Sequence, residues 1–396
     1  MRRESFTPEA PGTLFDVTVT IKDPLRGEMV DITSPAFVPQ LLPRTLALDG
    51  ALALLLEEAL HQMGTLSGIT TSVPTGSILL RPFMRREAVT SSRIEGTTTT
   101  YLELVAYEQL TMLEQARRPS GEPREVLSYV RAMEYGFAQP KERGLPLALI
   151  RELHAMLMDS DDRLHVTPGR FRRSVVFVGG QRLQTARFVP PPPHQVMDLM
   201  IAFERQIQVE STIPRLVWIG MLHYLFEAIH PFNDGNGRVG RILILLMLRQ
   251  FGLIRDPMLH LSNFIDEHKS DYLHLLLTVS THGDWGSWNE FMLTAFAHEA
   301  ARSVRVINQI QGLRVAVIAM LGADRDAALI GGIDAFLAEA QHSIGSLASA
   351  TGSSYNTGKR IMQRFVDVGF VRQVSAGSRN RVFQAPAVLE IFEGEG

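Results

Sequence analysis

The sequence contains no cysteine among its 396 residues. This absence excludes disulfides, zinc sites built from thiolates and catalysis by a cysteine nucleophile, and it is compatible with a reducing cytoplasm, where we expect the protein to be. The first residues lack the apolar core of a secretory signal. Apolar runs such as 242–248 fall far short of the ~20 residues that span a bilayer. We therefore expect a soluble chain without membrane contact.

A large excess of charge of one sign is also absent. The chain has 39 basic and 42 acidic residues, and its net charge of −3 excludes a protein that is basic throughout, though not a local basic surface. Apolar residues make up 45% of the chain, a globular composition that excludes disorder and a collagen-like chain. At ~100–200 residues per domain, the length predicts two or three domains.

The spacing of apolar residues predicts a mainly helical protein. Helices are expected at 46–61, 82–95, 100–115, 122–137, 146–158, 194–208, 214–229, 238–251, 270–278 and 288–311. Thr100 and Glu103 form a capping-box pattern at the start of the third helix. Residues 1–45 are predicted to be a partly irregular arm, and residues 64–80 a loop.

One β-hairpin is predicted within this helical pattern. Residues 174–178 and 186–189 are rich in β-branched and aromatic side chains, and Gly179 and Gly180 lie between them. The proline run 190–193 then ends the second strand, because proline has no N–H for a ladder.

The C-terminal segment has a different pattern. Two helical patterns at 343–351 and 354–368 precede a strand, a loop and a second strand, an order that resembles a winged helix-turn-helix. Its basic residues are Lys359, Arg360 and Arg364 in the second helix and Arg372, Arg379 and Arg381 in the wing. The module could contact DNA, or it could serve protein interaction or dimerisation. We expect an N-terminal extension at 1–118, a core at 119–315 and this module at 316–396.

The most informative stretch runs from His230 to Arg241 and reads HPFNDGNGRVGR. A polar loop with two glycines leads into a helix that is apolar nearly all round after Arg241. Free N–H groups at a helix start, together with glycines that allow close approach, favour a bound phosphate. Arg238 and Arg241 lie three residues apart, on one face of the predicted helix, and can hold phosphate oxygens.

Two further side chains of this stretch suit phosphoryl chemistry. Asp234 is a hard oxygen ligand of the kind that Mg²⁺ shares with phosphates. His230 has the side chain whose pKa suits a general base near neutral pH. Each feature alone is common in ordinary loops, but together they predict a nucleotide phosphate site beside a base. His223, on the same face of the preceding helix, is interpreted as a core residue.

The stretch resembles the Fic family signature, His-x-Phe-x-Asp/Glu-Gly-Asn-Gly-Arg-x-x-Arg, at every fixed position. The resemblance implies a helical Fic core that transfers AMP from ATP, with Mg²⁺, to a hydroxyl of a target protein. It implies that His230 deprotonates the hydroxyl, that Phe232 anchors the loop and that Asp234 positions Mg²⁺. The residues it implies for phosphate binding are Gly235, Asn236, Gly237, Arg238 and Arg241.

Two looser similarities flank this signature. Residues 169–172 and the predicted hairpin resemble the flap that positions the target in this family. Asp271-Tyr272 and the tryptophans at 285 and 288 resemble its downstream helices, which makes Tyr272 a candidate nucleotide-binding residue. The family often has a second tyrosine where Leu273 stands, so the adenine pocket departs from the usual pattern.

An upstream motif, Ser91-x-x-x-Glu95-Gly96, resembles the inhibitory helix of the family. Glu95 is expected in the last turn of its helix, where the dipole disfavours a negative charge by about 0.3–1 kcal/mol. We expect it to pair with Arg241. The alternative is a surface glutamate before a glycine that ends the helix.

These observations favour a protein adenylyltransferase that is autoinhibited by Glu95. The expected partner is an unknown hydroxyl-bearing target, with self-modification and a homo-oligomer as further expectations. One alternative is a transcription regulator whose Fic fold only senses a nucleotide. Another is a Fic enzyme of different specificity, which removes AMP or transfers UMP.

Overall fold

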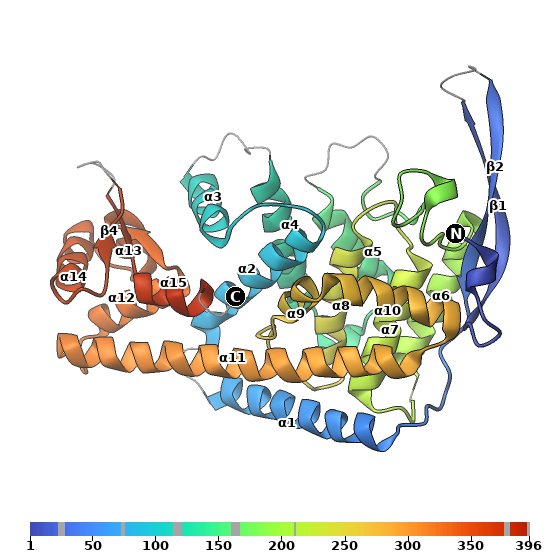
Figure 1. Cartoon of the computed structure of the whole chain (residues 1–396). Coiled ribbons are helices and arrows are strands. Elements are labelled where there is room, and N and C mark those ends of the chain that lie inside the picture. Colours follow the sequence, from blue (N-terminus) through green and yellow to red (C-terminus); the bar gives the residue numbers. More distant parts are fainter. Residues whose placement is uncertain are drawn as a thin grey trace.

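The computed structural model describes the chain except for residues 23–27, 73–75, 114–120, 160–166, 210, 376–380 and 394–396. It is mainly helical, as predicted (Figure 1). The body contains α1 (Gly50–Ser72), α2 (Gly76–Ile94), α3 (Tyr101–Leu113), α4 (Glu122–Ala138), α5 (Leu147–Leu157), α6 (Val196–Gln208), α7 (Arg215–Ile229), α8 (Asn236–Gln250), α9 (Leu261–Glu267), α10 (Lys269–His282) and α11 (Trp285–Leu321).

Helix α8 lies at the centre of the body. All of its residues from Arg238 to Leu248 are buried, because α2, α4, α5 and α7 pack around it. An apolar helix surrounded in this way is fixed in position, and so is the loop that leads into it. The signature loop is therefore held by the core.

Helix α11 is the longest element that the structure describes, and it runs along α1 (Figure 1). Among the described helices it is the one long and apolar enough to cross a membrane. This is weak evidence for a membrane role, because the core helices of globular proteins can have the same length and composition. Its first half buries Trp288, Phe291 and Phe296 in the body. The expected domain boundary near residue 315 falls inside α11, so the chain enters the C-terminal module without a break.

The predicted irregular arm is wrong over 12–22 and 29–39. There β1 (Gly12–Lys22) pairs with β2 (Met29–Pro39) in a long antiparallel ladder, which projects from the body (Figure 1). Thr18 lies opposite Thr33, and their hydroxyls are 2.9 Å apart. The Val-Thr-Val-Thr-Ile alternation of 17–21 fits a two-faced strand, and the prolines and glycines nearby obscured it.

The predicted loop at 64–80 is also wrong, because α1 continues to Ser72 and α2 begins at Gly76. The hydroxyls of Thr65, Thr70 and Thr71 donate to carbonyls three or four residues earlier, so these side chains are satisfied within the helix. Packing of α1 on α11 then supplies stability that local propensity does not.

The predicted hairpin at 174–189 is reduced to one bridge. Val178 and Phe188 exchange backbone hydrogen bonds of 2.9 and 3.1 Å, and a short 3₁₀ helix, Leu183–Thr185, stands in the connection. Leu183 is buried against β1 and β2, which pulls the connection away from a regular ladder. We call residues 174–189 the flap.

The C-terminal module contains α12 (Ala327–Ala338), β3 (Gln341–Ser343), α13 (Ile344–Ala350), α14 (Tyr355–Asp367), β4 (Arg372–Gln373), β5 (Val382–Gln384) and α15 (Pro386–Glu393). The three strands form a small sheet in the order β3-β5-β4. Two helices followed by two paired strands is the expected element order, and the winged-helix assignment itself stays a prediction. Arg379 lies outside the described residues, and Arg364 of α14 donates to the carbonyl of Leu321.

Candidate functional site

A pocket of about 430 Å³ lies between the end of α2, the loop from α7 to α8, α10 and the flap. Five of the predicted site residues line it: Glu95, His230, Gly237, Arg241 and Tyr272. The other predicted residues do not line it: Ser91, Gly96, Asp234, Gly235, Asn236 and Arg238. The site is therefore assembled from four elements that are far apart in the sequence.

His230 ends α7 in a left-handed conformation, with φ 50° and ψ 62°. The buried Arg172 holds it there, since its Nε donates to the His230 carbonyl at 2.8 Å. Burial, and then the charge of Arg172, lowers the pKa of His230 to about 4. The imidazole is neutral near pH 7 and able to accept a proton.

The loop after His230 is shaped by Asn236. Its side chain accepts from the Phe232 amide and donates to the Phe232 carbonyl, both at 2.9 Å. Phe232 is fully buried and stacks on His154 at 3.7 Å, nearly parallel. His154 Nδ1 accepts from the Gly169 amide at 2.9 Å, so its Nε2 donates to the Asp234 carbonyl at 3.1 Å. Asn236 thus shapes the loop from behind the pocket wall.

Arg238 and Arg241 point to different neighbours, although they lie on one helix face in the prediction. Arg238 is almost buried, 3.6 Å from Glu125 and 3.9 Å from Asp234 Oδ1. The Asp234 carboxylate also accepts from the Gly235 amide at 2.6 Å. Within the described residues no three or more acidic or histidine side chains gather into a metal site. Asp234 could hold Mg²⁺ as a single carboxylate together with phosphate oxygens, the usual arrangement for this ion.

Arg241 contacts the expected inhibitory motif directly. Its Nε donates to Ser91 Oγ at 2.7 Å, and its Nη2 donates to the Ser91 carbonyl at 2.9 Å and to Glu95 Oε1 at 2.7 Å. Burial alone would raise the pKa of Glu95, but Arg241 holds that pKa below its usual value. Gly96 follows with φ 105°, a conformation that favours glycine where α2 ends.

The Glu95 carboxylate also lies against Gly237. A Cβ at Gly237 would clash with Glu95 Oε1 and lie 2.9 Å from Arg241 Nη1. An oxyanion thus already rests on the first turn of α8 beside a buried arginine, where a phosphate would be stabilised. This observation indicates that the residues present fit a nucleotide phosphate.

The wall on the α10 side is aromatic and polar. Tyr272 is buried, and its hydroxyl is 2.8 Å from His223 Nε2, which places His223 in the core as expected. Glu227, which was not predicted as a site residue, lines the pocket, and burial raises its pKa to about 8. Arg172 as a clamp on His230 and His154 as a support of the loop were also missed, because their partners are distant in sequence.

Two family profiles match the chain in consecutive regions. The Fic/DOC family N-terminal profile matches residues 53–138, which include Ser91 and Glu95. The Fic/DOC family profile matches residues 144–248, which include the flap and the signature loop.

Curated relatives share part of the chain. A probable protein adenylyltransferase of Aquifex aeolicus is 30% identical over 162 residues, covering 36% of this chain and 48% of its own. The protein adenylyltransferase Fic of Drosophila erecta is 32% identical over 197 residues, covering 48% of this chain and 36% of its own. The chain thus spans less than half the length of these relatives.

Solved structures share the fold. A Fic family protein from Desulfovibrio desulfuricans G20 has a TM-score of 0.54 at 22% identity, covering 86% of this chain and 97% of its own. Fic-1 of C. elegans has a TM-score of 0.51 at 19% identity, covering 66% of this chain and 74% of its own. Both family regions stand in order and the signature loop lines a pocket, so residues 53–138 and 144–248 of this chain are a Fic/DOC N-terminal region followed by a Fic/DOC region.

Proposed function

We propose that the protein is an adenylyltransferase that transfers AMP from ATP to a hydroxyl of a target protein or of its own chain. The observation that carries this proposal is a neutral His230 in one pocket with Arg241 and the first turn of α8. The curated relatives are named protein adenylyltransferases, which supports the same reaction.

In this reaction His230 takes the proton of the attacking hydroxyl. His230 Nδ1 lies 3.4 Å from the Glu227 carbonyl, where it can act only as a donor, so Nε2 is the proton acceptor. The hydroxyl oxygen forms a bond to the α-phosphorus, the bond from that phosphorus to the bridging oxygen of the β-phosphate breaks, and diphosphate leaves. Positioning and charge stabilisation supply most of the catalysis in such a step.

The phosphates are assigned to the start of α8. The backbone at Gly237 faces the pocket without a side chain, and Arg241 provides the charge for the β- and γ-phosphates. Gly235 and Asn236 shape this turn, and Arg238 supports it from the α4 and α5 side. Mg²⁺ would be held by Asp234 and phosphate oxygens, and it would neutralise charge on the leaving diphosphate.

Glu95 restrains this activity. Its carboxylate engages Arg241 and rests on Gly237, so it competes with the terminal phosphates of ATP for the same groups. A nucleotide bound beside it would be displaced, and a small displacement of the α-phosphate costs a large factor in rate.

The test is labelling with ATP and with each other nucleoside triphosphate, followed by mass spectrometry of the modified chain. We expect an AMP adduct with ATP and its loss by about 10²–10⁴-fold in His230→Ala, the usual contribution of a general base. Near-normal labelling by folded His230→Ala would contradict the assignment of the base. A UMP adduct, or ATP binding without any adduct, would favour the alternative specificities.

Glu95→Gly tests the inhibition. We expect labelling well above that of the wild type, and an intermediate level in the matched Glu95→Gln variant, which keeps the shape but loses the charge. Arg241→Ala should stay inactive even in the Glu95→Gly background, because there it acts on ATP. Unchanged labelling in Glu95→Gly would mean that residues 91–96 have no inhibitory role and are only the end of a helix.

A further inference from the structure

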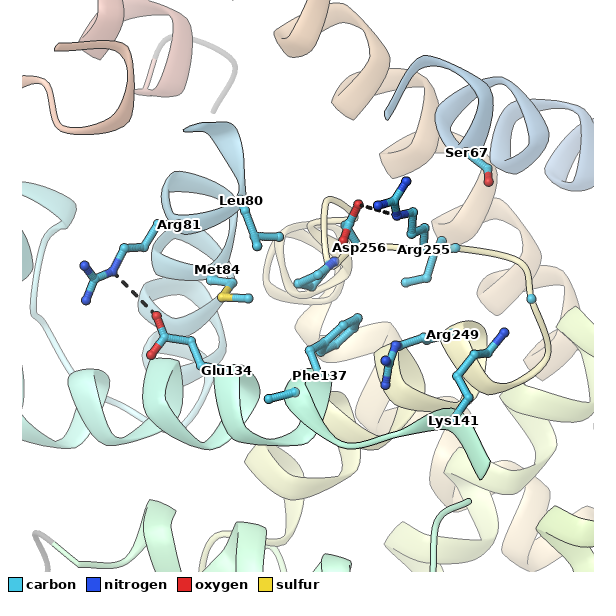
Figure 2. A pocket seen from close by; sticks show the side chains of 14 residues that line it. Ser67, Leu80, Arg81, Met84, Glu134, Phe137, Lys141, Arg249, Arg255 and Asp256 are labelled. Carbon is cyan, nitrogen blue, oxygen red and sulfur yellow. Dashed lines mark ion pairs between the residues drawn. The ribbon is translucent and has the colours of Figure 1, made fainter. Parts of the chain in front are cut away.

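A second pocket, of about 700 Å³, lies apart from the nucleotide pocket, between the first half of α2 and the C-terminal ends of α4 and α8 (Figure 2). Its volume is in the range of small-molecule sites, ~300–1,000 Å³. Its charged lining residues are Arg81, Glu134, Lys141, Arg249, Arg255 and Asp256. It shares no lining residue with the nucleotide pocket.

The charge of this pocket is positive, whereas the whole chain carries −3. Its two carboxylates are only loosely paired, with Arg81 at 3.5 Å from Glu134 and Arg255 at 3.7 Å from Asp256. The Lys141 backbone carbonyl accepts from the Gly144 amide at 3.0 Å, but its side chain has no hydrogen bond or ion pair with any residue that the structure describes. A pocket that has more cationic than anionic side chains attracts an anion.

Arg249 has donors to spare. Its Nη1 donates to the Gln139 carbonyl at 3.0 Å, which compensates the negative end of α4. Its guanidinium lies 5.6 Å from the centre of the Phe137 ring. A guanidinium carries five N–H donors, so this capping bond leaves others for a ligand.

Apart from Ser67, the remaining wall is apolar. It is formed by Leu80, the buried Met84, Phe137, Ile254 and Pro257. In Figure 2 Phe137 lies between the side chains of Met84 and Arg249. A ligand with an anionic group and a flat apolar part would satisfy both the cations and this wall.

Two helices connect this pocket with the nucleotide pocket. Helix α2 carries Arg81 at one pocket and ends at Ile94, directly before Glu95 at the other, a span of about 21 Å at 1.5 Å per residue. Helix α8 carries Arg249 at one pocket and Arg241 at the other. A ligand in the second pocket would contact both helices that the pair of Glu95 and Arg241 joins.

We propose that this second pocket binds a small organic phosphate with an aromatic part, and that the ligand acts as an effector of the nucleotide pocket. The proposal that a ligand binds depends only on the pocket and its lining residues. The effector role rests on the proposed function of Glu95 and Arg241.

Phenyl phosphate is the probe, titrated calorimetrically into the full chain. We expect a Kd of about 1 mM or tighter, weaker binding of inorganic phosphate, and a loss of at least ~10-fold, or 1.4 kcal/mol, in Lys141→Glu. The matched control Lys359→Glu, in α14, should bind as the wild type does. Arg241→Ala, which removes a cation of the other pocket, should still bind, with an affinity changed by no more than the coupling between the two pockets. Absent binding, binding that survives Lys141→Glu, or binding lost in Arg241→Ala would overturn the site.

The effector role is tested by the affinity for ATP, measured with and without saturating phenyl phosphate. We expect a change of about 5-fold or more, in the range of allosteric coupling, and its loss in Glu95→Gly, where the paired carboxylate is absent. An unchanged ATP affinity in the wild type, or an equal change in Glu95→Gly, would overturn the effector role. Neither readout uses AMP transfer, so failure of the proposed reaction would remain distinguishable.

Discussion

One buried carboxyl near the site, that of Glu87, has a pKa that could not be predicted from the sequence. Glu87, in the middle of α2, is 1% exposed and accepts hydrogen bonds from the hydroxyl of Ser262 and, at 3.1 Å, from its amide. Burial raises its pKa to about 7. This carboxyl joins α2, which ends directly before Glu95, to α9, so its protonation affects how firmly α2 is held.

Glu87→Gln should change how stability depends on pH. The pKa of Glu87 is higher in the folded chain than the 4.5 of an ordinary glutamate, so the folded state binds the proton more tightly. Its stabilisation is therefore present below about pH 4.5 and is lost as the pH rises to about 7, at roughly 1 kcal/mol per pH unit. Thermal unfolding of both proteins between pH 5 and 8 should give a smaller decline for Glu87→Gln. Parallel curves would contradict the raised pKa.

Asn236→Ala should loosen the signature loop. The substitution removes both hydrogen bonds to Phe232 and leaves buried backbone groups unpaired, which costs about 1–3 kcal/mol. We expect lower stability in denaturant unfolding and weaker ATP binding, because the turn at Gly237 depends on the same loop. Thr294→Ala is the control, since its hydroxyl donates to the Glu290 carbonyl within α11 and not to the signature loop. Wild-type ATP affinity in Asn236→Ala would contradict a role in shaping the loop.

Among the elements, α2 has contacts with both the body and the C-terminal module. Arg85 pairs with Glu108 of α3 and, at 2.9 Å, with Glu339 just after α12. Phe392 of α15 lies 6.3 Å from the rings of Phe83 and Tyr101. The helix that presents Glu95 to Arg241 is thus held in place by residues from the end of the chain.

Phe392→Ala should weaken this hold. Loss of a buried phenylalanine in a core typically costs about 3–5 kcal/mol, and we expect a value at or below this range because α15 lies near the chain end. Looser packing of α2 should raise labelling above the wild type. Phe370→Ala is the control, because that buried ring packs on Phe336 and Phe365 within the module. Equal increases in both variants would assign the effect to the module as a whole.

At the scale of the whole molecule, α11 connects the Fic core and the module as one continuous helix (Figure 1). The module exposes Lys359 and Arg360 on α14, whereas Arg364 caps the end of α11. Lys359 and Arg360 are therefore better candidates than Arg364 for contact with an external partner.

If α14 contacts DNA, affinity should fall steeply with salt, and each phosphate contact should add ~0.9 to the log–log slope. The double variant Lys359→Ala, Arg360→Ala should lower the slope by up to about 2, whereas Arg205→Ala, on α6, should leave it unchanged. Affinity for a duplex at several salt concentrations checks this. Absent binding at low salt would favour protein interaction for the module.

The helical pattern and the signature loop could be predicted from sequence because they depend on neighbours in the chain. The capping box at Thr100 is confirmed, with the Thr100 amide donating to Glu103 at 2.8 Å. The ladder of β1 and β2 and the extension of α1 were missed, since the first requires a partner strand and the second requires α11. Local propensity is weak where tertiary packing overrides it.

By itself the sequence determined the helix-rich class and the polar loop from His230 to Gly237, because these follow from local spacing, whereas the expected pairing of Glu95 with Arg241 depended on the resemblance to the Fic family. Only the tertiary structure decided that Arg238 diverges from Arg241, that Arg172 and His154 support the loop, and that the C-terminal module holds α2. The physical reason is that these contacts join residues far apart in the chain. Their energies arise from burial and from geometry, which appear only once the chain has folded.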